Sequence, residues 1–182
     1  MARRIVSIWL PRLATDLILR REPAWRDKPL VPYVEIGPRL SVASVNAAPE
    51  REGIAPGMAL ADARALDAGL GALPHDPART ARALKALARF SDRFTPLAAI
   101  DGADGLFLDM AGATHLFGGE AAFMQRLAVV LTKLGFAART AMADTPGAAW
   151  ALARHGQPGV IAPPGTPRDL LAPLPVAALR LK

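Results

Sequence analysis

The chain has 182 residues, is 52% hydrophobic and carries a formal net charge of +6, so it can bury a core and favours a polyanionic partner such as nucleic acid. It contains no cysteine, and its three histidines lack metal-ligand spacing, which excludes disulfides, thiolate chemistry and a zinc site. No apolar run approaches the roughly 20 residues of a membrane span. Pro11-Arg12 ends the first apolar stretch too early for a signal peptide. We therefore expect a cytoplasmic protein without a membrane partner.

Hydrophobic periodicity and turn residues predict the elements of the first part of the chain. Gly37-Pro38 marks a turn between two strands, and the residues from Asp67 to Gly71 are turn formers that end a helix. The expected order is a strand at residues 5–10, a helix at 14–21, strands at 30–34 and 40–45, and a helix at 59–66.

A long helix is predicted at residues 78–93, and it carries a basic stripe. At about 100° per residue, five basic side chains fall within roughly a third of the helix circumference. They are Arg79, Arg82, Lys85, Arg89 and Arg93. Such a stripe is either a solvated helix face or a surface that follows nucleic-acid phosphates. These five residues are the candidate DNA-binding set.

The second half of the chain continues as strands alternating with helices. The expected elements are strands at residues 97–100 and 106–110, a helix at 120–133, a strand at 137–143, a helix at 146–154 and a loop at 158–167. Together with the first strand, this order predicts an α+β fold of the ferredoxin-like type (βαββαβ), into which a second, smaller module is inserted.

Residues 94–109 carry the most specific motif. It reads Phe94-Thr95-Pro96, seven further residues, Asp104-Gly105 and then Leu106-Phe107-Leu108-Asp109. Without a gap, it resembles the palm motif of Y-family (lesion-bypass) DNA polymerases, in which Asp-Glu stands where Asp104-Gly105 stands here. In that family, carboxylates hold the two metal ions that drive phosphoryl transfer. The resemblance implies that Asp104 is a vestigial metal-ligand position and that Gly105 is a lost one.

The first strand has also lost its expected metal ligands. In the family this strand ends in Asp-x-Asp, and Trp9 and Pro11 occupy those two positions. Neither side chain can ligate Mg²⁺, which demands oxygen ligands, and we expect Trp9 to fill the former metal pocket. Asp101 lies outside the motif, and strand alternation predicts that it points to the opposite face from Asp104.

The positions that hold the incoming triphosphate in the family are altered as well. Counting back from the Gly53-Ile54 match, Ala47 falls on a Tyr position and Glu50 on an Arg position, where a carboxylate would repel the triphosphate. A one-residue slip that puts Arg51 on the Arg position stays open. Pro146 replaces a Lys and is suited to begin a helix.

The resemblance therefore implies a pseudoenzyme. Phosphoryl transfer depends on metals and cations for nearly all of its catalysis, so we expect no nucleotidyl transfer and no bound metal or cofactor. Two alternatives remain open. One is a divergent, active, Mg-dependent translesion polymerase in which Asp101, Asp104 and Asp16 converge on a metal. The other is a protein-interaction module that does not bind DNA.

The resemblance covers nearly the whole chain and implies its organisation. It places a palm at residues 1–11 and 87–165, fingers at 12–86, and the start of a thumb or linker at 166–182. The segments 9–16 and 143–154 look like the catalytically inactive members that act in the bacterial SOS mutasome. That group implies an adaptor in SOS-induced mutagenesis and translesion DNA repair. The implied partners are DNA, an error-prone C-family polymerase, a RecA-like mutasome subunit and the sliding clamp.

Overall fold

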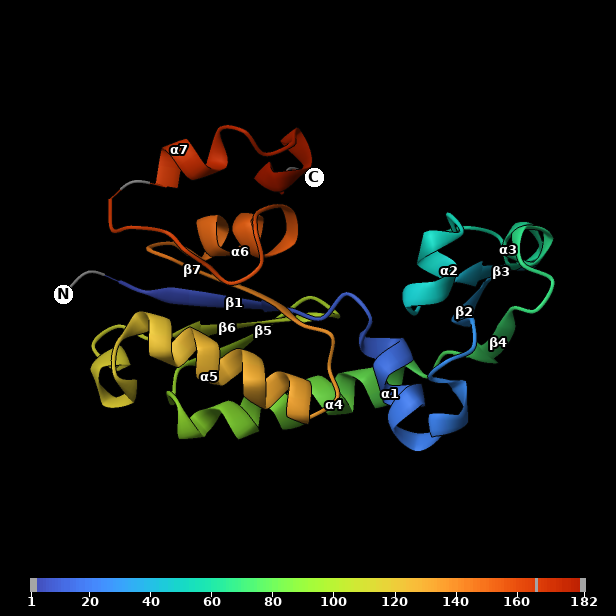
Figure 1. The fold of residues 1–182 in the computed structure, drawn as a ribbon, viewed down its shortest axis with the longest axis horizontal. Coiled ribbons are helices and arrows are strands. Elements are labelled where there is room, and N and C mark those ends of the chain that lie inside the picture. Colours follow the sequence, from blue (N-terminus) through green and yellow to red (C-terminus); the bar gives the residue numbers. More distant parts are fainter. Residues whose placement is uncertain (1–2, 166, 181–182) are drawn as a thin grey trace. The chain divides into compact units, whose positions relative to one another are not determined.

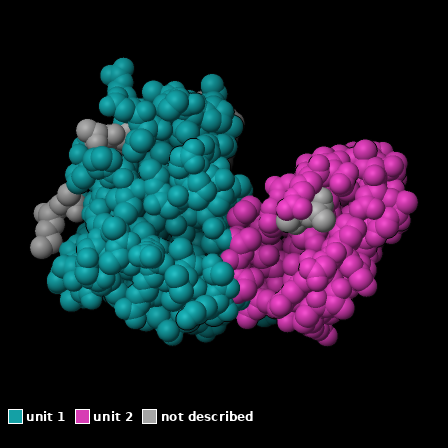
Figure 2. Space-filling model, in the orientation of Figure 1, with its two compact units in different colours: residues 1–10, 81–134, 138–182 teal, residues 11–80, 135–137 magenta. Residues whose placement is uncertain are grey.

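The structure is a computed structural model that describes residues 3–165 and 167–180. The chain divides into two compact units (Figure 2). Unit 1 comprises residues 1–10, 81–134 and 138–182, and unit 2 comprises residues 11–80 and 135–137. Unit 2 is therefore mainly an insertion after the first strand of unit 1.

Within the described residues, unit 1 is built on a five-stranded sheet in the order β5-β6-β1-β7-β8. The strands are β1 (Ile5–Trp9), β5 (Ala98–Asp101), β6 (Gly105–Asp109), β7 (Arg139–Ala143) and β8 (Val160–Ile161). Strand β1 lies between β6 and β7 and is antiparallel to both, whereas β8 is parallel to β7. With one helix before β5 and another before β7, the first four strands form the ferredoxin-like arrangement. The predicted fold class is confirmed.

Helices cover both faces of this sheet (Figure 1). One face carries α4 (Pro77–Phe90), whose first residues belong to unit 2, and α5 (Glu120–Lys133). The other face carries α6 (Pro146–His155), and α7 (Pro167–Leu171) packs against α6. The short 3-10 turns are η2 (Ser91–Arg93), η3 (Thr114–Phe117) and η4 (Val176–Leu179). No helix in the described ranges is long and apolar enough to cross a membrane.

Small residues bring α6 close to the sheet. The core beneath α6 consists largely of alanine, joined by Ile5 and Leu152. Alanine side chains let a helix backbone approach the strands closely, which fixes where the longer side chains of α6 emerge. On the opposite face, the rings of Phe94, Phe117 and Phe123 pack together with centroids 5.2 to 5.8 Å apart, and Phe94 meets the other two edge to face.

Unit 2 has its own small sheet and core. Its described residues form a three-stranded sheet in the order β3-β2-β4, with β2 (Leu30–Ile36), β3 (Arg39–Val42) and β4 (Gly71–Pro74). The helical elements are α1 (Leu13–Arg21), η1 (Pro23–Trp25), α2 (Ala47–Arg51) and α3 (Leu60–Leu66). Buried aliphatic side chains that include Val31, Val42 and Ile54 fill the space between them.

The structure corrects several predicted elements. Strand β4 begins where only turn residues were expected, β8 lies within a predicted loop, and α2 was not predicted. Both strands are short and pair in parallel with a neighbouring strand, so tertiary pairing rather than local pattern decides their state. The helix predicted at 78–93 ends at Phe90, where Ser91 Oγ donates to the Leu87 carbonyl and a 3-10 turn follows.

Candidate functional site

The β5–β6 hairpin carries the two carboxylates of the site. Asp101 ends β5 opposite Gly105, and the turn between them contains Gly102 with a φ of +61°. Arg154 Nη2 donates to Asp104 Oδ1 at 3.1 Å and lies 3.5 Å from Asp101 Oδ2. The prediction that Asp101 and Asp104 face opposite ways is therefore wrong. Strand alternation stops at the turn, which brings Asp104 back toward the carboxylate of Asp101.

The Thr-Pro end of the motif holds this hairpin in shape. Thr95 Oγ1 donates to the Asp109 carbonyl at 2.7 Å, and the Asp109 N–H donates to the Leu97 carbonyl at 2.9 Å. The Asp109 side chain accepts the N–H of Ala111 at 3.0 Å. Both ends of the 94–109 motif are thus tied together, so Thr95 and Asp109 have structural roles here.

Trp9 reaches the site from the end of the central strand. It pairs with Gly105 on β6 and with Arg139 on β7. Its Nε1–H donates to Asp104 Oδ2 at 2.8 Å. A Cβ at position 105 would lie 3.0 Å from the Asp101 carbonyl oxygen and 3.3 Å from Asp101 Oδ2. A glutamate at position 105 would therefore crowd the buried Asp101 carboxylate, whereas glycine leaves room for it.

Arg154 supplies the central positive charge. Its guanidinium carbon lies 4.4 Å from the ring centroid of Trp150 and 5.4 Å from that of Trp9, distances at which the ring faces attract a cation. Its side chain is 11% exposed. Burial lowers the pKa of the Arg154 guanidinium, and Asp104 and Asp101 oppose that shift. The cation is thus enclosed by two aromatic rings and two carboxylates.

Arg180 adds a second cation from the segment after η4. Its Nη2 donates to Asp101 Oδ1 at 2.6 Å, and its guanidinium carbon lies 5.1 Å from the Trp150 ring centroid. The Asp101 side chain is 5% exposed. Among the described residues, Arg154 Nη1 and Trp150 Nε1 are buried without a hydrogen-bond partner. Two guanidinium groups therefore balance the charge of the two carboxylates.

This donor set does not fit a pair of magnesium ions. Mg²⁺ requires oxygen ligands in near-octahedral geometry, and Trp9, Pro11 and Gly105 offer no side-chain oxygen. The two carboxylates present are already bonded to guanidinium or indole groups. In the part of the chain that the structure describes, no group of three or more Asp, Glu, His or Cys side chains is placed to hold a metal ion.

Asp16 has its contacts within unit 2. It belongs to unit 2, and its Oδ2 accepts the N–H of Ala137 at 2.8 Å. The side chain is buried, and this burial raises the pKa of Asp16 to about 6 despite the opposing effects of the Ala137 hydrogen bond and of Arg12 and Arg20. The hydrogen bond from Ala137 explains the position of the Asp16 side chain, and its burial within unit 2 explains the raised pKa.

The predicted triphosphate positions are distributed over both units. In unit 2, Glu50 forms an ion pair with Arg12. Ala47 is the first residue of α2, and its side chain lies outside the described part of the structure. In unit 1, Pro146 is the first residue of α6, and the Thr145 hydroxyl accepts the N–H of Ala148 at 3.2 Å. Pro146 therefore starts a capped helix, as its position predicts.

The five residues of the basic stripe have different environments. Arg79 is half-buried and donates to the Leu17 carbonyl at 3.0 Å within unit 2. Arg93 lies in η2, where its guanidinium sits 3.6 Å from the Phe90 ring centroid. The remaining three, which we call the α4 basic set, are exposed on one helix: Arg82, Lys85 and Arg89.

Arg154, Arg180 and Trp150 were not among the site residues predicted from the sequence. One signal was available, because Trp150 and Arg154 are four residues apart and such residues are neighbours on a helix surface. The partners of Arg154 lie about fifty residues earlier in the chain, and no local pattern connects them.

Comparisons with known proteins agree with this architecture. The profile of the IMS: impB/mucB/samB family matches residues 8–154. Protein ImuB of Caulobacter vibrioides (strain NA1000 / CB15N) is 54% identical over 129 residues, which are 71% of this chain and 28% of that protein. The chain thus spans little more than a quarter of this curated relative.

Solved structures show the same fold at low sequence identity. The insertion ternary complex of Dbh DNA polymerase matches with a TM-score of 0.83 and 16% identity, over 96% of this chain and 53% of that one. DinB from Sulfolobus solfataricus matches with a TM-score of 0.76 and 16% identity, over 90% of this chain and 49% of that one. The predicted resemblance to Y-family polymerases is confirmed, and the chain belongs to the impB/mucB/samB family.

Proposed function

We propose that this chain is a non-catalytic Y-family homologue that serves as an adaptor in SOS-induced mutagenesis and translesion DNA repair, acting in the cytoplasm. The observation that carries the proposal is the occupation of Asp104. Both of its oxygens are engaged, one by Trp9 at 2.8 Å and the other by Arg154 at 3.1 Å. A divalent ion would have to displace a guanidinium that two carboxylates and two rings already hold.

The charge balance supports the same proposal. Polymerase chemistry relies on metal ions and cations that stabilise the charge on the transferring phosphate. Here the sequence has a Trp, a Pro and a Gly at three carboxylate positions and Pro146 at a lysine position. Because these groups act together, their joint absence is expected to abolish nucleotidyl transfer rather than to slow it.

We assign residues 1–11 and 87–165 to the palm, residues 12–86 to the fingers and residues 166–182 to the start of a thumb or linker. The assignment rests on the order of elements and on the insertion of unit 2 after β1. The fit of the chain to about half of each polymerase structure is consistent with it.

Primer extension tests the absence of catalysis. The wild-type chain and Asp104→Ala are compared on a primer–template with Mg²⁺ and with Mn²⁺, with an active Y-family polymerase as the positive control. We expect no incorporation by either chain. Incorporation by the wild type that disappears in Asp104→Ala would refute the proposal.

We further propose that DNA is bound weakly through the α4 basic set. Contacts of this kind release counterions, so the affinity should fall steeply with salt. Fluorescence anisotropy with single-stranded and primer–template DNA should show weaker binding for Arg82→Glu/Arg89→Glu at every sequence tested. The control Arg26→Glu/Arg64→Glu changes the net charge equally at exposed positions of unit 2. Absence of binding at low salt would favour a protein-interaction module without a DNA role.

The proposed protein partners are an error-prone C-family polymerase, a RecA-like mutasome subunit and the sliding clamp. They are supported by the similarity to ImuB, of which this chain matches 28%. Pairwise binding of each purified partner to this chain, measured by biolayer interferometry, separates contacts made by these two units from contacts made elsewhere in the longer relatives.

A further inference from the structure

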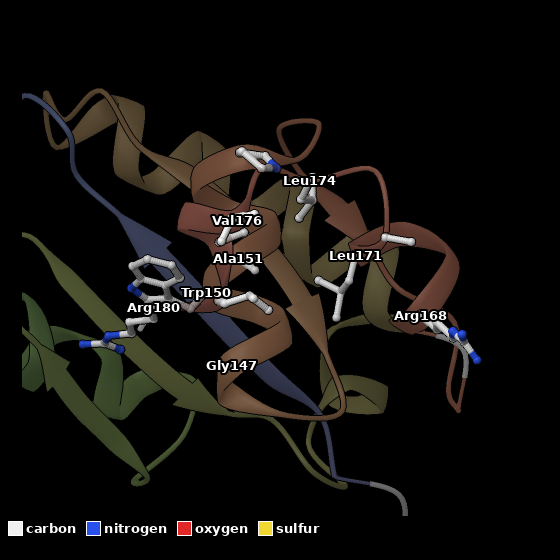
Figure 3. A pocket seen from close by; sticks show the side chains of 12 residues that line it. Gly147, Trp150, Ala151, Arg168, Leu171, Leu174, Val176 and Arg180 are labelled. Carbon is white, nitrogen blue, oxygen red and sulfur yellow. The ribbon is translucent and has the colours of Figure 1, made fainter. Parts of the chain in front are cut away.

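A groove of about 760 Å³ lies in unit 1 between α6 and the segment that contains α7 and η4 (Figure 3). Trp150 and Ala151 of α6 line one side, and Leu171, Leu174 and Val176 line the other. This volume falls within the range of roughly 300 to 1,000 Å³ that is typical of ligand pockets. The groove is therefore large enough to accept several side chains of a bound segment.

The rim and floor of the groove are apolar and accessible. Val176 is 75% exposed and Leu179 is 66% exposed, and apolar side chains gathered at a groove mark an interaction surface. Gly147 lies in the first turn of α6, and a Cβ added there would meet nothing within 4 Å. Because it has no side chain, Gly147 leaves its part of the groove lining open to close approach.

The charged side chains that line the groove are arginines. Arg168 and Arg180 lie at its opposite ends (Figure 3), and Arg154 lies against the Trp150 ring at 4.4 Å. No Asp or Glu is among the described residues that line the groove. Arg180 is bonded to Asp101 yet remains 53% exposed. Apolar walls between two arginines complement a segment with apolar side chains flanked by carboxylates.

We propose that this groove docks a short segment of a partner protein in which apolar side chains are flanked by Asp or Glu. Two recurring modes fit this surface, an amphipathic helix laid into an apolar groove and acidic residues held by arginines. Trp150 and the arginines are residue types that dominate binding energy at interfaces. The inference goes beyond the proposed function, because such docking does not depend on whether the Asp104 site is catalytic.

Three fluorescein-labelled 12-residue peptides test the proposal with the whole chain. The first carries Leu and Phe at helical spacing between Asp and Glu, the second replaces the acidic residues with Lys, and the third replaces the apolar residues with Ser. Fluorescence anisotropy should show binding of the first peptide at least about tenfold tighter than of the other two. Chemical-shift changes should map to α6, α7 and η4.

Two variants locate the peptide. Gly147→Gln fills open space in the floor, so it should fold normally and weaken binding of the first peptide at least about tenfold. Arg168→Glu should shift preference toward the Lys peptide. The control Ala121→Gln makes a similar change at an exposed position of α5.

Three results would overturn the inference. The first is that the three peptides bind equally well or that none of them binds. The second is that the first peptide binds Gly147→Gln as tightly as the wild type. The third is that the wild-type chain associates with itself and that Gly147→Gln abolishes this association. The last result would identify a second copy of the chain as the occupant of the groove. None of them alters the primer-extension result, so failure here is distinct from failure of the proposed function.

Discussion

Replacing Arg154 with Met tests whether the guanidinium organises the site around Asp104. Methionine keeps an unbranched stem against Trp9 and Trp150 but removes the charge and its hydrogen bonds. Asp101 would keep one partner, Arg180, and its buried Oδ2 would lose the cation 3.5 Å away. Asp104 is 43% exposed and would retain the indole N–H and solvent.

The expected loss of stability can be worked from these contacts. We take the loss of one of the two cations of the buried Asp101, which keeps Arg180, as about 1–3 kcal/mol, and the half-exposed pair with Asp104 adds about 1 kcal/mol or less. The stacking on Trp150 contributes about 1 kcal/mol, part of which methionine replaces. We therefore expect Arg154→Met to lower the free energy of unfolding by about 2–4 kcal/mol, or to lower Tm by roughly 5–15 °C.

Urea unfolding followed by tryptophan fluorescence measures this change, because Trp9 and Trp150 both contact the guanidinium. Arg89→Met, at an exposed position of α4, is the matched control and should change the stability by less than about 0.5 kcal/mol. Arg154→Met/Asp101→Asn should recover part of the loss, since the buried charge that has lost one of its two cations is then removed. A loss for Arg154→Met as small as that of the control would refute the reasoning.

Two further predictions concern unit 2. The raised pKa of Asp16, about 6 against an ordinary 3.8, means that the folded state binds the proton more tightly, so stability is lost as pH rises from about 4 to 6. The side-chain oxygen of Asp16→Asn can still accept the Ala137 N–H. In urea titrations, the free energy of unfolding of this variant should rise by about 3 kcal/mol relative to the wild type between pH 4 and 6 and then level off. A difference in stability that does not change with pH would contradict this cause. Gly71→Ala should destabilise the protein by about 1–3 kcal/mol, because the new Cβ would lie 2.2 Å from the Trp25 ring. Thermal unfolding checks this. In the Trp25→Ala background, Gly71→Ala should cause no further loss of stability, and an unchanged Tm for Gly71→Ala in the wild type would count against the overlap.

The parts of the fold that were predicted correctly have strong local patterns. Helix α5 has the predicted bounds, Glu120–Lys133, because its apolar residues recur at helical spacing over fourteen positions and Gly135 follows. Strand β1 is a compact apolar run that Pro11 ends. In both cases the information lies within the element itself.

The elements and contacts that were missed depend on distant residues. Strand β8 has two residues and exists through its parallel pairing with β7. The face of Asp101 was predicted wrongly because the turn, not the strand period, decides where Asp104 returns. The contact between Arg154 and Asp104 joins residues fifty positions apart, and the motif around Asp104 does not indicate which distant side chain lies beside it.

The central claim is that the Asp104 site is closed to divalent ions by the protein's own cation. Titration with Mn²⁺, followed by electron paramagnetic resonance in the presence of primer–template DNA and a nonhydrolysable nucleotide, tests it directly. We expect no bound Mn²⁺ that depends on Asp104, so the wild type and Asp104→Asn should give the same titration curve. Two ions bound per chain in the wild type and lost in Asp104→Asn would contradict the account.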